Sequence, residues 1–242
     1  MNGLVVIPAR MGATRFPGKP LVQICGKPMI QWVYESTVAA MGPDNVVVAT
    51  PDTAILEFCA AHGMEAAVTS ESHTTGTARV AEVARSRSAD FFINVQGDEP
   101  LIEPATITAC AEAFLDPQVQ LSSVYAEVPR EEMEDPSCVS VVLDKDGYAL
   151  YFSRHTLPYP RSAHQSVLKH VGIYGYRPEP LQAFAELEPP AIELAESLEQ
   201  LRFLYHGYRM KMMPGPATEA AVDLPEHVGL VEEVLRARAK RE

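Results

Sequence analysis

Three fixed positive charges, Arg10, Arg15 and Lys19, lie in one short loop directly after the apolar run at residues 4–7. Guanidinium forks and an ammonium group bind phosphate oxygens well, and a loop rich in Gly and Pro exposes backbone N–H groups to the same ligand. These cations stand out because the whole chain has 20 basic against 32 acidic side chains. The loop predicts a polyanion site, with a nucleotide triphosphate as the favoured ligand and an ordinary solvated loop as the alternative.

The basic loop matches neither of two common nucleotide-binding motifs. Gly18-Lys19 is followed by Pro20 instead of Ser or Thr, so the loop is not a Walker P-loop. No G-x-G-x-x-G sequence follows the first apolar run, so the dinucleotide-binding fingerprint is missing as well. The pattern therefore favours phosphate binding and argues against dehydrogenase chemistry.

A second set of charged residues, Asp98 and Glu99, follows the apolar run at 90–95. Carboxylates beside phosphates are explained if a divalent cation lies between them, and Mg²⁺ is commonly held by one or two carboxylates plus substrate phosphates. Asp223 is the candidate for the second carboxylate. The alternatives are an ordinary acidic turn at Asp98 and a helix N-cap at Asp223.

Three further polar clusters each have a functional and a structural interpretation. Residues 73–79 are typical of an anion-binding or base-recognition loop, or of a simple turn in which Thr77 caps the next helix. His170, in a β-rich run, is either a ligand-binding residue or a core histidine with its hydrogen bonds satisfied. Glu199 and Arg202 are one helical turn apart, the spacing of a solvated ion pair.

The elements that must position these residues alternate between strand and helix patterns in the first half of the chain. This order predicts an α/β fold, a doubly wound and mainly parallel sheet whose ligands bind at the carboxyl ends of the strands. Asp52 is expected to cap the second helix. Strands are expected at 4–7, 45–49, 66–69 and 90–95, and helices at 29–41, 52–62, 77–87 and 104–115.

The middle of the chain is richer in strand patterns separated by Pro, Asp and Gly turns. We predict one domain over 1–242 that contains a smaller mixed β lobe at about 121–176, which serves the acceptor or a dimer contact. Strands are expected at 121–127, 139–143, 148–153, 168–176 and 210–213, helices at 179–187, 192–205 and 225–238, and a polar connection at 161–166.

The composition argues against a protein that binds nucleic acid nonspecifically, spans a membrane or is secreted. The net charge of −12 argues against nonspecific binding of nucleic acid or anionic membranes. No run of apolar residues is long enough for a membrane span, and no signal-peptide pattern is present at the first residues. The four cysteines show no C-x-x-C spacing and are expected to be reduced thiols of a cytoplasmic protein.

Taken in order, the motifs resemble those of the CMP-Kdo synthetases (3-deoxy-manno-octulosonate cytidylyltransferases), and the similarity spans essentially the whole chain. The matching segments are IPAR at 7–10, R-x-PGKPL at 15–21, GKPMI at 26–30, residues 73–79, NVQGDEP at 94–100, ALYFSR at 149–154, KHVGIY at 169–174 and AESLEQLR at 195–202.

The resemblance implies a glycosyltransferase-A-like fold, a homodimer, and Mg²⁺-dependent transfer of CMP from CTP to an acidic sugar with release of pyrophosphate. It implies that Arg15, Lys19, Asp98 and Asp223 are catalytic, and that the two aspartates bind the metal. The implied CTP-binding residues are Pro8, Ala9, Arg10, Arg15, Lys19, His73, Thr75, Gly76, Gln96 and Gly97. The implied acceptor-binding residues are Arg79, Gln96, Arg154, His170, Tyr174, Glu199 and Gln200.

Several positions depart from the pattern of that family. The usual Gly-Val-Asp-Thr-Pro is changed at Ala221 and Leu224, and a usual lysine is Ser140. Smaller departures are Pro51, Ala13 and the segment 75–78. These changes fit either drift or a reshaped acceptor pocket, so 8-amino-Kdo and phosphonoformate remain alternative acceptors. A non-catalytic CTP-binding homologue is a further alternative, opposed by the retained cations and aspartates.

Overall fold

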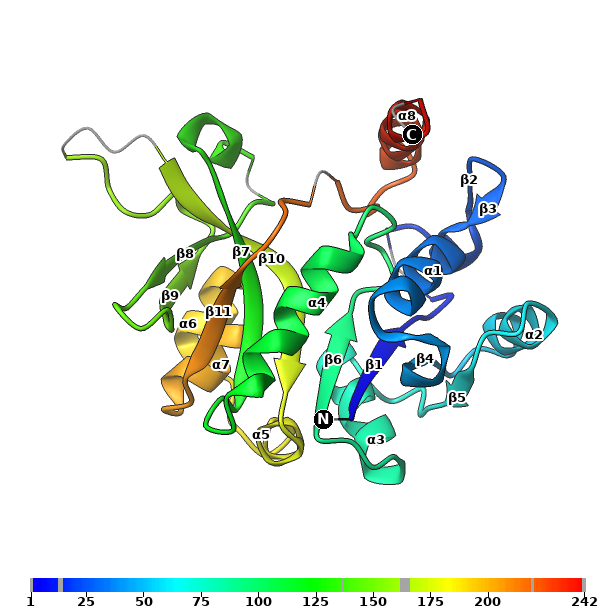
Figure 1. Ribbon diagram of the computed structural model, residues 1–242, viewed down its shortest axis with the longest axis horizontal. Coiled ribbons are helices and arrows are strands. Elements are labelled where there is room, and N and C mark those ends of the chain that lie inside the picture. The colour runs from blue at the N-terminus through cyan, green and yellow to red at the C-terminus, as the bar shows by residue number, and fades with distance from the viewer. Residues whose placement is uncertain (1, 13–14, 136, 162–165, 219, 241–242) are drawn as a thin grey trace.

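The computed structural model describes residues 2–12, 15–135, 137–161, 166–218 and 220–240. A nine-stranded sheet forms its centre, in the order β11-β7-β10-β6-β1-β4-β5, with β8 paired to β10 and β9 paired to β8. Figure 1 shows helices α1 and α4 in front of this sheet and α3 behind it. The predicted α/β architecture with a mainly parallel sheet is confirmed.

The first half of the chain forms the parallel part of the sheet. Strand β1 pairs in parallel with both β4 and β6, and β4 pairs in parallel with β5. Such strands are covered on both faces, which explains their continuous apolar runs. The strands are β1 (Gly3–Pro8), β4 (Val46–Thr50), β5 (Ala66–Val68) and β6 (Phe91–Val95). The helices are α1 (Met29–Met41), α2 (Thr53–Ala61), α3 (Gly76–Ser86) and α4 (Pro104–Glu112).

Residues 121–176, for which a smaller lobe is predicted, contribute two long strands to the central sheet. Strand β10 (Ser166–Tyr176) is antiparallel to both β6 and β7 (Leu121–Pro129). The short strands β8 (Ser140–Leu143) and β9 (Ala149–Ser153) extend from β10. Part of the predicted polar connection at 161–166 lies outside the described residues. The antiparallel β10 makes the sheet mixed at this side.

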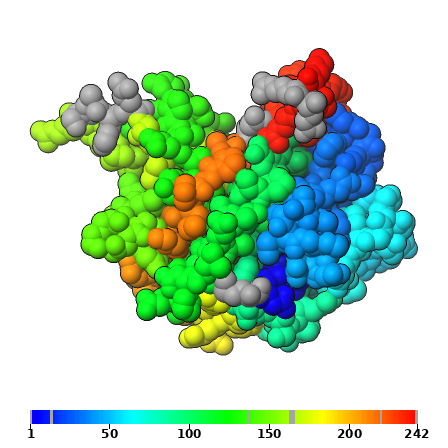
Figure 2. All heavy atoms as spheres, viewed as in Figure 1, coloured from blue at the N-terminus to red at the C-terminus, as the bar shows by residue number. Residues whose placement is uncertain are grey.

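The last elements are β11 (Met210–Pro214), which pairs in parallel with β7, and α8 (His227–Arg238). In Figure 2 the orange segment that contains β11 crosses the visible face beside the green segments, and the red C-terminal helix lies above the blue N-terminal region. A short hairpin of β2 (Gln23–Ile24) and β3 (Lys27–Pro28), which was not predicted, contacts α8 through Glu232, whose carboxylate accepts from the Cys25 backbone N–H. 3-10 helices occur at Lys19–Leu21, Pro43–Asn45, Ala113–Leu115 and Arg130–Met133.

The predicted helix over 192–205 is wrong, because the chain turns within it. It forms α6 (Ala191–Glu196) and α7 (Gln200–Tyr205), separated at Ser197, whose backbone is left-handed with φ 52°. The expected Glu199–Arg202 pair is also wrong, since Arg202 forms a buried ion pair with Glu193 across the turn. The helix predicted at 179–187 is shorter, α5 (Pro178–Ala183).

Of the two expected helix caps, Asp52 does stand at the N-cap position of α2, whereas Thr77 does not cap α3. Asp52 stands at the start of α2, but its carboxylate accepts from the Met11 backbone N–H at 2.8 Å and makes no capping bond. Helix α3 is capped by Thr75, whose hydroxyl accepts from the Ala78 N–H, while the Thr77 hydroxyl donates to Glu199. Each of these side chains bonds instead to a residue on another segment, Asp52 to Met11 and Thr77 to Glu199.

Within the described ranges, no helix combines the length and apolar composition that crossing a bilayer requires.

Candidate active site

A cavity of about 330 Å³ lies at the carboxyl ends of β1 and β6, where an open α/β sheet binds its ligands. Every residue predicted to bind CTP lines it, and so do both predicted metal ligands. The lining residues are Pro8, Ala9, Arg10, Arg15, Phe16, Lys19, Pro20, Met29, His73, Thr74, Thr75, Gly76, Arg79, Gln96, Gly97, Asp98 and Asp223. We call this cavity the nucleotide pocket.

One cation lies between the two aspartates of this pocket. The ammonium Nζ of Lys19 is 2.7 Å from Asp98 Oδ2 and 3.6 Å from Asp223 Oδ1, and Arg15 lies 3.0 Å from the same Asp223 oxygen. The segment before Asp223 is held beside Asp98 because the Val222 N–H donates to the Asp98 carbonyl. Two carboxylates that reach one positive centre are a suitable donor set for Mg²⁺ completed by phosphate oxygens.

Asp223 therefore does not act as the helix N-cap that was its alternative interpretation, because α8 begins at His227. The backbone also approaches closely at Gly97, where a Cβ would lie 2.8 Å from the Pro8 carbonyl oxygen. A larger residue at Gly97 would push apart the two strand ends that form the pocket floor. Backbone packing and ion pairs thus hold the basic loop and the acidic turn together.

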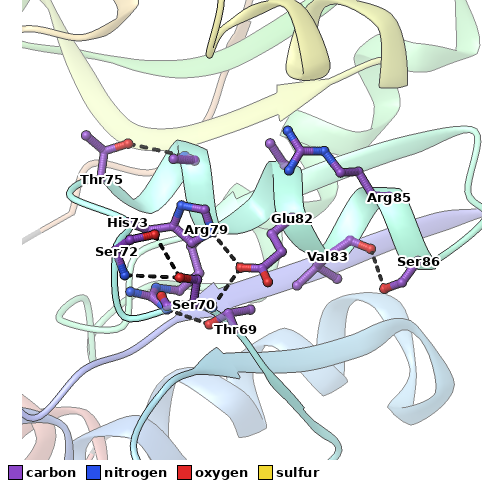
Figure 3. Close-up of polar contacts among 12 residues, drawn as sticks. Thr69, Ser70, Ser72, His73, Thr75, Arg79, Glu82, Val83, Arg85 and Ser86 are labelled. Atoms are coloured by element: carbon purple, nitrogen blue, oxygen red, sulfur yellow. Dashed lines mark hydrogen bonds and ion pairs between the residues drawn. The ribbon is translucent and has the colours of Figure 1, made fainter.

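The segment between β5 and α3 forms another wall of the nucleotide pocket (Figure 3). Arg79 is 3% exposed and donates to the Thr69 hydroxyl and the Ser70 carbonyl. Burial, and then the charge of Arg10, lower the pKa of Arg79. Arg79 was predicted to bind the acceptor, but the structure places it on the nucleotide side, where it fixes this segment.

A second cavity of about 300 Å³ adjoins the first, and the two share Gly76 and Gln96. We call it the acceptor pocket. It contains four residues predicted to bind the acceptor besides Gln96, together with six that were not. The lining residues are Gly76, Thr77, Gln96, Arg154, Tyr174, Tyr176, Ser197, Leu198, Glu199, Gln200 and Phe203. A molecule in each cavity would meet the other at Gly76 and Gln96.

Hydrogen-bonding groups of the acceptor pocket are partly buried. Desolvation is the main cause that raises the pKa of Glu199, and it also raises the pKa of Tyr174. The Tyr174 hydroxyl donates to the Gln200 side-chain carbonyl at 3.3 Å, and the amide nitrogen of Gln200 is buried with no hydrogen-bond partner. Leaving a buried donor of this kind unpaired costs about 1–3 kcal/mol, so it is placed to donate to an oxygen atom that enters the pocket.

Arg154 reaches the acceptor pocket from the end of β9. Its Nε donates to the Glu196 carbonyl at 2.7 Å, and its backbone N–H donates to the Glu196 carboxylate at 2.9 Å. The same carboxylate accepts from the Ser153 hydroxyl. At the turn that ends α6, the carbonyl oxygens of Glu196 and Ser197 and the Glu196 carboxylate all accept hydrogen bonds from Arg154, next to the end of β9.

His170 differs from its predicted role, since it lines neither described cavity. Its side chain is buried, packs edge-on against Phe152, and its Nε2 lies 2.9 Å from the Ser123 hydroxyl oxygen. Burial lowers the pKa of His170 to about 3. The structure therefore places it beneath the acceptor pocket as a neutral packing residue, which matches its structural alternative.

Ser140, where the family pattern has a lysine, is the first residue of β8, fully buried and paired with Ser153 of β9 and Lys169 of β10. Its hydroxyl accepts from the Leu157 N–H and lies within hydrogen-bond distance of the Ser153 and His155 carbonyls. It therefore fixes the backbone on either side of Arg154. Nothing in the structure explains the changes at Ala221 and Leu224, and Ala13 lies outside the described residues.

The comparisons with known proteins agree with this arrangement. A family model described as cytidylyltransferase matches residues 4–212. A 3-deoxy-manno-octulosonate cytidylyltransferase of Vibrio vulnificus (strain CMCP6) is 41% identical, covering 99% of this chain and 100% of its own. The enzyme of the same name from Geobacter sulfurreducens is 43% identical, covering 98% and 100%.

Solved structures match as well. The structure of a CMP:2-keto-3-deoxy-manno-octonic acid synthetase complexed with CTP superimposes with a TM-score of 0.94 at 40% identity, covering 98% of this chain and 100% of its own. A 4-diphosphocytidyl-2C-methyl-D-erythritol synthase from Anaerococcus prevotii shares the fold, with a TM-score of 0.65 at 11% identity.

Proposed function

The chain belongs to the cytidylyltransferase family, and from this premise we propose that it transfers CMP from CTP to 3-deoxy-manno-octulosonate (Kdo) and releases pyrophosphate. It is a CTP-dependent nucleotidyltransferase. The observation that carries the proposal is the junction of the nucleotide and acceptor pockets at Gly76 and Gln96. A reaction between two bound molecules requires such a junction, because holding both in place removes much of the entropic barrier.

The composition of the acceptor pocket supports a polyhydroxylated acid over a small dianion. Among its described lining residues Arg154 is the one cation, and Glu199 adds a carboxyl group. A buried carboxyl and the amide of Gln200 suit sugar hydroxyls, while Arg154 suits a single carboxylate. Phosphonoformate has no hydroxyls and carries more charge in less volume, so this lining favours Kdo.

The reaction requires an acceptor oxygen to attack the α-phosphorus of CTP in line with the leaving pyrophosphate. The protein contributes positioning and charge neutralisation more than covalent chemistry. Arg10, Arg15 and Lys19 line the pocket where the triphosphate would lie, and their charges stabilise the departing pyrophosphate. Gln96, at the junction, orients the α-phosphate and the acceptor toward each other.

We also propose that Asp98 and Asp223 hold Mg²⁺, as the shared approach of both carboxylates to Lys19 supports. When bound, the metal would neutralise phosphate charge and polarise the phosphorus. The chain's own contribution is to hold the two carboxylates together through the Val222–Asp98 backbone bond. If Mg²⁺ bound between the two carboxylates, the Lys19 ammonium would be free to bind the phosphates instead.

A cytoplasmic homodimer is part of the proposal. Leu150 in β9 and Tyr159 in the loop that follows are 61% and 82% exposed, and in the proposed dimer a second copy would cover them. Size-exclusion chromatography with light scattering tests this, and a monomeric mass at micromolar concentration would contradict it.

The activity is tested by incubating the protein with CTP, Mg²⁺ and Kdo and following the phosphorus NMR spectrum. We expect loss of the triphosphate signals together with new signals from pyrophosphate and a CMP ester. Unchanged CTP in the presence of Kdo and Mg²⁺ would contradict the proposal.

A further inference from the structure

Glu82, in α3, contacts the segment that carries His73 to the nucleotide pocket at two points. Its Oε2 accepts from the Ser70 backbone N–H at 2.9 Å and lies 2.5 Å from Nε2 of His73. Figure 3 shows the Glu82 side chain pointing from the helix toward this segment. The His73 side chain is 18% exposed, so its ring is shielded from most of the solvent. Glu82 itself is outside the lining of the nucleotide pocket.

The carboxylate of Glu82 is ionised at neutral pH. The hydrogen bond from the Ser70 backbone lowers its pKa most, and the contact with His73 lowers it further. An ionised carboxylate only accepts hydrogen bonds, so Nε2 of His73 must carry a proton to bind it. The second ring nitrogen, Nδ1, is then the one available to a ligand.

We propose that Glu82 is a positioning residue for nucleotide binding: it fixes the proton on Nε2 of His73 and presents Nδ1 to the bound nucleotide. This inference rests on the proposed function, because it assigns a nucleotide to the pocket that His73 lines. Carboxylates play the same part toward metal-binding histidines, where they fix the tautomer and the ring orientation.

The neighbouring Arg79 makes this role separable from simple support of the segment. The hydrogen bonds of Arg79 to Thr69 and Ser70 do not involve Glu82. A glutamine at position 82 still accepts from the Ser70 N–H, so the segment stays attached. The substitution Glu82→Gln therefore replaces the charged acceptor of the His73 proton by a weaker, neutral one while it leaves the segment in place.

The first test measures CTP affinity by calorimetry without acceptor, for wild type, E82Q, H73Q and the double variant. We expect E82Q to weaken binding about tenfold, the size of one lost hydrogen bond to a charged group. In the H73Q background the same change should weaken it less than about twofold, because contacting residues are not additive. R85Q, on the same helix but bonded to Gln182, is the matched control and should bind as wild type.

Nitrogen NMR of histidine-labelled protein at alkaline pH gives the second test, since it identifies the tautomer directly. We expect His73 to carry its proton on Nε2 in wild type and to populate both tautomers in E82Q. A proton on Nδ1 in wild type, or equal weakening by E82Q in both backgrounds, would overturn the inference. If wild type failed to bind CTP, the proposed function and the nucleotide part of this inference would fall together, whereas the other outcomes concern Glu82 alone.

Discussion

Glu196 and Arg154 are joined by two hydrogen bonds, each between the side chain of one residue and the backbone of the other. The Glu196 carboxylate accepts from the Arg154 N–H at 2.9 Å, and the Arg154 guanidinium donates to the Glu196 carbonyl at 2.7 Å. Arg154 and Ser197 line the acceptor pocket, whereas Glu196 does not. The position of the guanidinium at the pocket thus depends on a carboxylate outside it.

We predict that Glu196→Ala raises the KM for the acceptor by about 10–100-fold, since a misplacement of about 1 Å has effects of this order. The KM for CTP should change by less than about twofold, because the nucleotide pocket is untouched. Steady-state kinetics with each substrate varied in turn measure both values. Glu186→Gln, at an exposed position in the same region, is the control. Equal changes in both KM values would contradict a role confined to the acceptor.

Replacing Asp98 by Asn should lower kcat by at least about 100-fold, because it removes a charged ligand of the Mg²⁺ that would neutralise the reacting phosphates. The amide keeps the size of the side chain but loses the charge that pairs with Lys19. Addition of EDTA to wild type should abolish turnover, and excess Mg²⁺ should restore it. Asp44→Asn, at an exposed position, should leave kcat unchanged. Near-normal turnover of the Asp98 variant would exclude it as a metal ligand.

The protein should lose stability as the pH falls below 6.5, in part through His170. Burial lowers its pKa from 6.5 to about 3, so between these values the unfolded chain binds a proton that the folded chain does not. At one pKa unit per about 1.4 kcal/mol, lowering the pH from 6.5 to 4.5 removes up to about 3 kcal/mol. Urea unfolding of His170→Gln should show a flatter dependence on pH, while His62→Gln, at an exposed site, should keep the wild-type slope.

Ser140→Ala should destabilise the fold by about 1 kcal/mol, because it leaves the partly buried Leu157 N–H without its acceptor. The KM for the acceptor should also rise, since the hydroxyl fixes the backbone that carries Arg154. Thermal unfolding and acceptor kinetics measure the two effects. Ser88→Ala, at an exposed position, is the control. A stable variant with an unchanged acceptor KM would mean that Ser140 has no part in holding this loop.

The sequence allowed the gathering of residues in the nucleotide pocket to be predicted, because Arg10 and Asp98 closely follow apolar strands. Parallel strands bring their carboxyl ends to one edge of a sheet, so residues at those ends meet whatever their separation along the chain. The predicted fold class rests on the same alternation of strand and helix, and the topology confirms it.

The acceptor side was predicted less completely because its geometry depends on tertiary contacts. Glu196 resembles an ordinary solvated helix residue in sequence, and its partners Ser153 and Arg154 lie on another segment. The left-handed turn at Ser197 interrupts a continuous helical pattern without Gly or Pro. The pairing of β10 with β7 also shifts register between Val171 and Tyr174, which periodicity alone does not reveal.

The central claim is that the acceptor is Kdo, and a comparison of acceptors at fixed CTP and Mg²⁺ tests it most directly. Pyrophosphate release should be measured with Kdo, 8-amino-Kdo, phosphonoformate, a sialic acid and no acceptor. The account predicts that Kdo gives the highest kcat/KM and that phosphonoformate gives no more release than the reaction without acceptor. A higher kcat/KM for phosphonoformate than for Kdo would contradict the assignment and identify the acceptor pocket as one built for a small dianion.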